Sequence, residues 1–152
     1  LIQQMVPDDW HEITLHWHWD WGVAELNWIT SQRECDRATA VFALCSGAPG
    51  EVATRRQRGD DHGWFVRDVA ARLEGGFYPN AELGLGLLMR QRLAFEAELA
   101  TARATGVSPW QLPEDLISFE GRRAHQPKYA VSDGRAHFAY EHWLEHLAAP
   151  QR

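Results

Sequence analysis

The chain of 152 residues lacks the sequence features that mark membrane spans, secretion and nucleotide binding. Its longest apolar run, Leu83–Met89, is interrupted by two glycines and is far shorter than the ~20 residues that a membrane span needs. The first residues show no basic stretch followed by an apolar segment, although a start at Leu1 is also compatible with a removed leader. No phosphate-binding glycine loop, dinucleotide fingerprint or Gly-x-Ser-x-Gly motif occurs. These absences argue against membrane insertion, nucleotide binding and serine-hydrolase chemistry.

Cysteine is scarce, and the spacing of the two cysteines argues against a disulfide. Cys35 and Cys45 are ten residues apart in what we expect to be one helix, which would separate them by ~15 Å. A disulfide requires Cα atoms within ~7 Å of each other. Two unpaired thiols are typical of a reducing compartment, so the sequence predicts a cytoplasmic protein.

Basic residues are nearly absent from the first third of the chain. Residues 1–50 hold two basic and seven acidic side chains, so this segment carries most of the net charge of −6. Binding to nucleic acid or to an anionic membrane needs a basic surface, and we therefore expect neither. An acidic surface suits a basic protein partner, whereas the alternative is that the charge only keeps the protein soluble.

Tryptophan, in contrast, is abundant. The chain contains eight, and five of them precede residue 29: Trp10, Trp17, Trp19, Trp21 and Trp28. At helical spacing such side chains are more often part of a core than of a ligand site, although the group around Trp17 and Trp19 could also stack on a sugar or a base. We expect a tightly packed N-terminal block, and nothing in the sequence indicates a cofactor.

Hydrophobic periodicity predicts an all-α fold, a single domain over residues 1–152 built from five to six helices. Pro7 marks the first helix start, and Asp20 and Asp36 are expected to cap the next two helices. The third helix, Arg37–Cys45, is apolar on nearly all sides and should be buried. A glycine at position 47 is its natural stop.

The remaining elements are predicted as two central helices, a loop and a last helix. The central helices are expected over Trp64–Leu73 and over Asn80–Gly106. Residues 109–127 are typical of a loop with one short turn at 114–119. We favour a last helix from about Ala136, and an Asp-Gly pair also indicates a small β-hairpin near residues 129–137.

One run of residues near the N-terminus is similar to a known bacterial motif. It consists of Trp19-Asp20-Trp21-Gly22, then Leu26 and Trp28-Ile29, then Cys35-Asp36 with Thr39-Ala40 and Phe42. This order resembles the bacterial domain-of-unknown-function 4274 family over roughly residues 15–55. The chain departs from the family in having His18 where asparagine is usual, and Ser46-Gly47-Ala48 in place of an aromatic-rich continuation. The resemblance implies a small helical domain and carries over no catalytic residues.

Acidic side chains are the candidate partner-binding residues, namely Asp8, Asp9, Glu12, Asp60, Asp61, Glu114 and Asp115. We expect the three acidic doublets among them to be exposed. Paired carboxylates act in acid–base catalysis where burial separates their pKa values, and loop doublets are poorly placed for that. They suit a surface that presents negative charge to a partner. The alternative is that they stabilise helix starts after Pro7 and Pro113.

Histidine is the residue type whose spacing suggests metal ligands. His142 and His146 lie four residues apart on the last predicted helix, so both rings could face one ion. The glutamate that follows the first histidine in metalloprotease motifs is replaced by a tryptophan. His11, His16 and His18 form a second group. We favour no metal site, and His142 and His146 are the candidates if one exists.

Small size, acidic charge and the absence of an assembled catalytic motif favour a binding protein over an enzyme. The sequence leads to the hypothesis of a cytoplasmic immunity-type protein, which neutralises a toxin or effector enzyme with a basic surface by occluding it. Two alternatives stay open. One is a metal-dependent enzyme that uses His142 and His146, and the other is a structural or adaptor domain.

Overall fold

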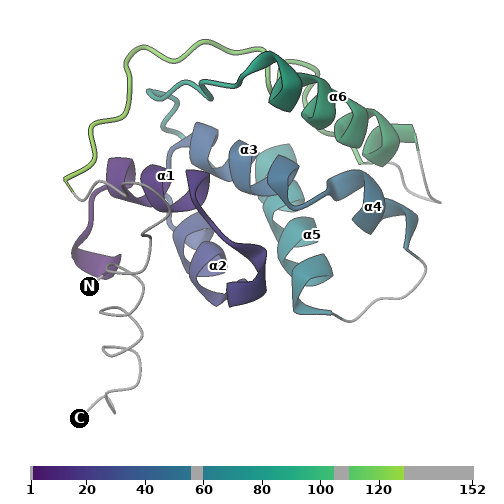
Figure 1. The fold of residues 1–152 in the computed structure, drawn as a ribbon, viewed down its shortest axis with the longest axis horizontal. Helices are drawn as coiled ribbons and strands as arrows, with labels where there is room; N and C mark the ends of the chain where they lie inside the picture. Colours follow the sequence, from purple (N-terminus) through teal and green to yellow (C-terminus); the bar gives the residue numbers. More distant parts are fainter. Residues whose placement is uncertain (1, 56–59, 105–109, 129–152) are drawn as a thin grey trace.

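The computed structural model describes residues 2–55, 60–104 and 110–128, and these form a bundle of six α-helices (Figure 1). In chain order the elements are η1 (Ile2–Gln4), α1 (Pro7–Leu15), η2 (Trp19–Trp21), α2 (Ala24–Ser31), α3 (Arg37–Ser46), α4 (Pro49–Thr54), α5 (Asp61–Glu74) and α6 (Met89–Ala104), where η1 and η2 are short 3-10 helices. No strand occurs in the described residues, so the predicted all-α class is confirmed. None of these helices is long and apolar enough to cross a bilayer.

Helix α3 lies at the centre of the bundle and packs against α1, α2, α5 and α6. Every residue from Ala38 to Cys45 is buried, as expected for a helix that is apolar on nearly all sides. Its start is stabilised by Asp36, whose carboxylate accepts a hydrogen bond from the Ala38 N–H at 2.9 Å. The helix ends at Ser46, directly before Gly47. The predicted cap and the predicted stop are both confirmed.

The prediction of a helix over Asn80–Gly106 is wrong for its first turns, because α6 begins only at Met89. The N–H groups of Glu82 and Leu83 donate instead to the second carboxylate oxygen of Asp36, at 2.8 and 3.2 Å. One carboxylate therefore caps α3 and also holds the segment before α6 in a non-helical conformation. Two glycines in this segment lower its helix propensity further, by ~1 kcal/mol each relative to alanine.

The cap expected at Asp20 is also wrong. Asp20 lies inside η2 with its side chain 90% exposed, and α2 begins at Ala24 with Val23 in the N-cap position. Gly22 adopts φ +89°, a left-handed conformation that ends η2 and separates it from α2. Asp20 therefore precedes this turn and lies too early in the chain to cap the helix.

The N-terminal tryptophans pack together, but most of them keep one side open to solvent. Trp10 is buried, whereas the other four are half-buried. Trp10 and Trp28 meet edge to face with their ring centroids 5.5 Å apart, and Trp17 and Trp21 do so at 5.4 Å. The predicted packed block is confirmed, although its rings lie at the rim of the core more than at its centre.

Both cysteines are buried and unpaired, as predicted. Cys45 lies on α3, whereas Cys35 precedes the Asp36 cap and does not share that helix. Burial raises the pKa of the Cys45 thiol to about 12, so this thiol stays protonated at neutral pH. The two side chains act as small core residues.

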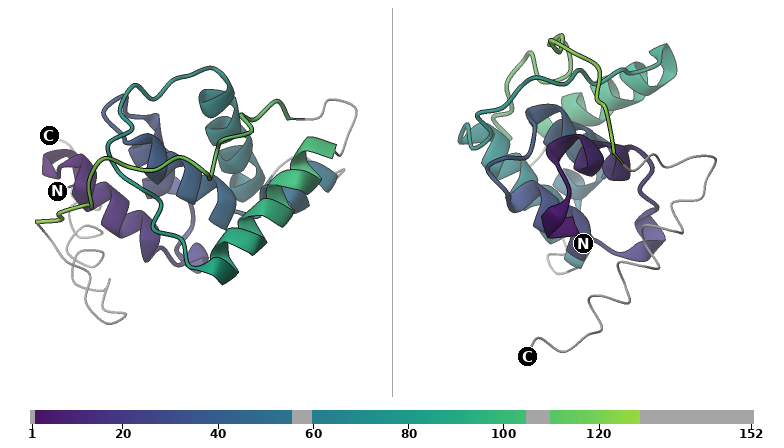
Figure 2. Two further views of the ribbon diagram at one scale, coloured as in Figure 1. Left: turned by 90° about the horizontal axis from the view of Figure 1, so that it is seen from above. Right: turned by 90° about the vertical axis from the view of Figure 1, so that its left-hand side faces the viewer.

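Residues 110–128, here termed the strap, contain no helix and cross the bundle to α1 (Figures 1 and 2). The loop predicted for this region is confirmed, with a turn at residues 114–118. The hairpin expected near residues 129–137 and the helix expected from Ala136 lie outside the described residues, as do His142 and His146.

The strap runs beside the segment that precedes α6 (Figure 2). The Arg122 and Arg123 N–H groups both donate to the Glu82 carbonyl oxygen, at 2.8 and 3.1 Å. Gly84 and Gly121 then meet backbone to backbone, since a Cβ atom on Gly121 would lie 2.0 Å from the Gly84 nitrogen. Glycine at position 121 is therefore required for the two segments to approach this closely.

Candidate functional site

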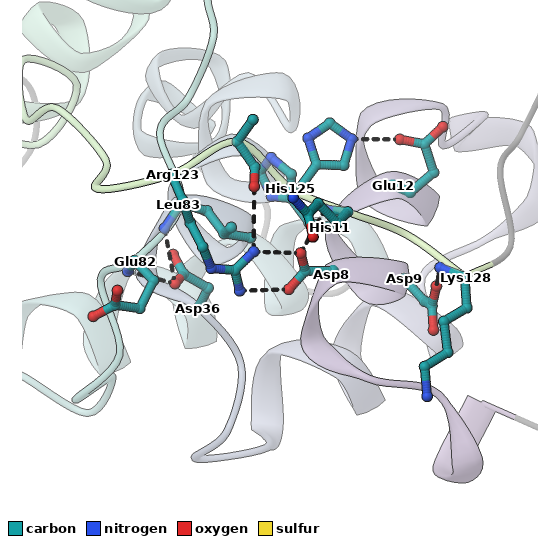
Figure 3. Close-up of polar contacts among 12 residues, drawn as sticks. Asp8, Asp9, His11, Glu12, Asp36, Glu82, Leu83, Arg123, His125 and Lys128 are labelled. Atoms are coloured by element: carbon teal, nitrogen blue, oxygen red, sulfur yellow. Dashed lines mark hydrogen bonds and ion pairs between the residues drawn. The ribbon is translucent and has the colours of Figure 1, made fainter.

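Asp8 and Asp9, which were predicted to be exposed, are buried on α1 beneath the strap. Asp8 accepts hydrogen bonds from both terminal nitrogens of Arg123, at 2.6 and 2.8 Å, and from the Gln126 N–H at 2.6 Å (Figure 3). Asp9 accepts one from the Lys128 N–H at 2.6 Å. Exposed fractions of 7% for Asp8 and 1% for Asp9 show that the expectation is wrong.

The doublet is buried because the strap supplies a cation and N–H donors to it. The hydrogen bonds from Arg123 lower the pKa of Asp8 to about 2, although burial opposes this shift. A bidentate guanidinium–carboxylate pair is among the stronger charge-assisted hydrogen bonds in proteins. Asp8 and Asp9 therefore hold the strap on α1, and their carboxylates are covered by it.

Glu12, one helical turn after Asp8, is also buried and lies between two histidines. One carboxylate oxygen lies 2.6 Å from Nε2 of His125 on the strap (Figure 3). The other lies 3.4 Å from Nε2 of His16 on α1. With 8% of its surface exposed, Glu12 offers little area to a protein partner.

A cavity of about 270 Å³ adjoins these groups. It is lined by the imidazoles of His11, His16 and His125, by Phe42 of α3 and by the backbone around Gly84. Nδ1 of His11 lies 2.9 Å from the Thr39 hydroxyl, and its ring centroid lies 5.0 Å from that of His125. Burial lowers the pKa of His11 to about 4, so this imidazole is neutral at pH 7.

The described lining of the cavity offers hydrogen-bonding groups, chiefly imidazoles. Nε2 of His125 donates to the Glu12 carboxylate, which leaves Nδ1 as the other hydrogen-bonding atom of the ring. No serine, threonine or cysteine is among the described residues that line the cavity. No three His, Cys, Asp or Glu side chains of the described residues are arranged to hold a metal ion. The described lining of the cavity offers polar groups that a small polar molecule could contact.

A second and larger hollow, here termed the tryptophan groove, lies between α5 and the η2–α2 turn. It has a volume of about 430 Å³. Its polar and aromatic lining comes from Trp21, Asn27, Asp61, Trp64, Phe65 and Asp68. Trp64 is 59% exposed, which is unusual for so large an apolar side chain. Neither aspartate makes a hydrogen bond or an ion pair within the described part of the chain.

The α5 wall of the groove is held in place at its N-terminus. Asp60 caps the helix, because its carboxylate accepts a hydrogen bond from the Gly63 N–H at 2.6 Å. His62 donates from Nε2 to the Gly47 carbonyl oxygen at 2.8 Å, and its ring lies 4.8 Å from that of Trp19. These contacts tie the start of α5 to the end of α3 and to η2, so the two walls of the groove are fixed relative to each other.

The predicted acidic residues thus fall into three places. Asp8, Asp9 and Glu12 lie beneath the strap, whereas Asp61 lines the tryptophan groove and Asp60 caps the helix next to it. Glu114 and Asp115 are exposed in the turn of the strap, where Asp115 pairs with Arg37 at 3.3 Å.

Sequence reasoning missed all the polar and aromatic residues of the groove except Asp61, namely Trp21, Asn27, Trp64, Phe65 and Asp68. A signal for two of them exists, because Asp61, Trp64 and Asp68 are spaced by three and four residues and so share one face of α5. Trp21 comes from a different element, and its place opposite this face depends on the tertiary structure. Comparisons of the chain with protein-family models, with curated proteins and with solved structures found no match, so the family resemblance remains a prediction.

Proposed function

We propose that this protein binds a basic protein partner through the tryptophan groove. The observation that carries the proposal is the exposed Trp64, which lies between two carboxylates that have no cationic partner in the described part of the chain. Tryptophan is enriched among the residues that dominate the binding energy of protein interfaces. The carboxylates would steer a basic partner toward that anchor, since complementary charge raises the rate of association.

The form of binding that we favour is that of an immunity-type protein, which neutralises a toxin or effector enzyme by covering its site. Nucleases and other enzymes that act on anionic substrates present basic surfaces, and a net charge of −6 suits such a partner. Occlusion needs an interface of ~800 Å² per partner, of which the groove would form the centre. A cytoplasmic location, expected from the unpaired cysteines, is part of this proposal.

Affinity capture with matched variants tests the proposal. The wild-type chain, Trp64→Ala and the double variant Asp61→Asn/Asp68→Asn would each be used to capture partners from a lysate of the source organism. The double variant Glu96→Gln/Glu120→Gln is the control, because it removes the same charge from exposed positions outside the groove. We expect one stoichiometric partner that both groove variants lose and the control retains. That partner should be an enzyme that the wild-type chain inhibits.

Equal capture by all four chains would contradict the groove as the interface. A partner could be captured through the groove and yet keep its full activity in the presence of the wild-type chain. That result would support protein binding by the groove and overturn the immunity role. An adaptor domain would then be the better description.

The metal-dependent enzyme remains the alternative from another functional class. Its candidate ligands, His142 and His146, lie outside the described residues. Metal analysis of protein purified without a histidine tag tests it directly. A stoichiometric transition metal that is lost in His142→Ala would favour this alternative over the binding protein.

A further inference from the structure

We propose that the tryptophan groove takes up the side chain of a single arginine from the partner. This inference rests on the proposed function, and it specifies the chemistry of the central contact. The shape of the groove, its uncompensated charge and its aromatic walls each favour such a side chain.

The shape of the groove fits one long side chain. Asp61, Trp64 and Asp68 share one face of α5, and a rise of 1.5 Å per residue sets the two aspartates about 10 Å apart along the helix axis. Trp21 and Asn27 form the opposite wall. The hollow has a volume of about 430 Å³, which is enough to receive one long side chain. An extended side chain can enter between the two indoles.

The negative charge of the groove favours the binding of a cation. Some exposed acids have cationic partners, as Asp60 does in Arg55 at 3.1 Å and Asp115 does in Arg37 at 3.3 Å. Asp61 and Asp68 have none within the described residues. A cation that enters the groove would meet both carboxylates and the face of an indole, and tryptophan is the side chain that attracts cations most strongly.

The same walls favour arginine over lysine. A guanidinium is planar, so it can stack on an indole while its N–H groups point to acceptors in its own plane. The two carboxylates and the Asn27 side-chain oxygen lie around the groove as such acceptors. A lysine ammonium is a compact and strongly hydrated charge that gains nothing from stacking. We therefore expect discrimination between the two cations.

Titration of the full chain with small-molecule probes tests this inference. The probes are N-acetyl-arginine amide, its lysine analogue and its citrulline analogue, which has nearly the shape of arginine but no charge. Binding would be followed through the NMR signals of the tryptophan indole N–H groups. We expect arginine to shift the Trp21 and Trp64 signals saturably, with a millimolar dissociation constant, and to bind at least about fivefold more tightly than lysine or citrulline.

Variants of the groove residues show whether the arginine probe binds in the tryptophan groove. Trp64→Ala and Asp61→Asn/Asp68→Asn should each weaken arginine binding about tenfold or more, while Glu96→Gln/Glu120→Gln should not change it. An equal response to citrulline, or shifts that survive both groove variants, would overturn the inference. So would the absence of any saturable shift.

The outcomes separate the inference from the proposed function. If the groove variants lose a partner protein but the arginine probe does not bind, the function stands and the arginine contact is wrong. If the arginine probe binds in the groove but no partner depends on the groove, the contact stands and the proposed function is wrong.

Discussion

Asp8 and Arg123 are separated by 115 residues in the chain and joined by two hydrogen bonds of 2.6 and 2.8 Å. This pair connects the first helix to the strap, and the backbone N–H of Gln126 adds a third hydrogen bond to the same carboxylate. The face of α1 that the sequence suggested for a partner protein is thus occupied by the protein's own strap (Figure 3).

Replacing Arg123 by glutamine should loosen the strap. The variant leaves the buried Asp8 carboxylate without its cation, so we expect a lower melting temperature and faster hydrogen exchange at the Gln126 and Lys128 N–H groups. Arg122→Gln is the matched control, since Arg122 is a neighbouring arginine with a long, exposed contact to Glu82 at 3.4 Å. Equal exchange rates in the two variants would show that the Asp8–Arg123 pair does not hold the strap.

Stability should fall in mild acid because of His11. The folded state lowers the pKa of this imidazole from 6.5 to about 4, so the unfolded chain binds the extra proton first as the pH falls. The contribution of neutral His11 to the free energy of unfolding is therefore fully present above pH 6.5 and is lost as the pH falls toward 4. At 1.36 kcal/mol per pKa unit, the total loss is about 3 kcal/mol. Chemical denaturation between pH 7 and pH 4 would measure this loss.

NMR titration of the wild-type chain provides a direct check on His11. Its ring signals should not titrate near pH 6.5, the ordinary value for this side chain. A His11 signal that titrates in the ordinary histidine range would contradict the burial argument.

Replacing Glu25 by methionine should stabilise the protein at pH 7. Glu25 is 6% exposed and its Oε2 atom has no hydrogen-bond partner within the described residues. Burial raises its pKa, so the wild type loses stability as the pH rises above 4.5, the ordinary value for this side chain. Removing the unsatisfied carboxyl should gain about 1 kcal/mol at pH 7 and less at pH 4.

The matched control for that experiment is Glu34→Met, which makes the same change at an exposed position. Its free energy of unfolding should stay within about 0.5 kcal/mol of the wild type at both pH values. A destabilised Glu25→Met variant would mean that the buried carboxyl is satisfied in solution.

Replacing Gly121 by alanine should displace the strap from the segment before α6. The added Cβ would lie 2.0 Å from the Gly84 nitrogen, a backbone atom that cannot move without shifting its own segment. We expect a loss of about 1–3 kcal/mol in unfolding free energy, measured by denaturant titration. Gly75→Ala is a milder control, because its Cβ would come no closer than 3.3 Å to the Ala71 oxygen.

Local sequence signals predicted the elements whose causes are local. Asp36 before an apolar run, and a glycine after it, were enough to predict α3 and both of its ends. The second role of Asp36, as an acceptor for Glu82 and Leu83, joins residues 46 and 47 positions apart, and no local pattern reports it. The predicted long helix was therefore wrong where this contact acts.

The candidate site shows the same contrast between features with local causes and features that depend on tertiary contacts. Asp61 was found as a member of an exposed acidic doublet, and the spacing to Trp64 and Asp68 could have extended the prediction along α5. The burial of Asp8, in contrast, depends on Arg123 folding back from the far end of the described chain. An acidic doublet after a proline looks the same in sequence whether solvent or an arginine covers it.

The strap also has a consequence for the order in which the protein can mature during synthesis. The α1 carboxylates leave the ribosome before the strap does. More than a hundred residues separate them from their hydrogen-bond partners in the strap, among them Arg123, Gln126 and Lys128. Until the strap emerges, α1 cannot bury these charges at low cost, because no cation or N–H donor of the strap is present. A chain interrupted before the strap would keep this helix face hydrated and poorly packed, and so open to proteases. The network can therefore form only when the strap has been made.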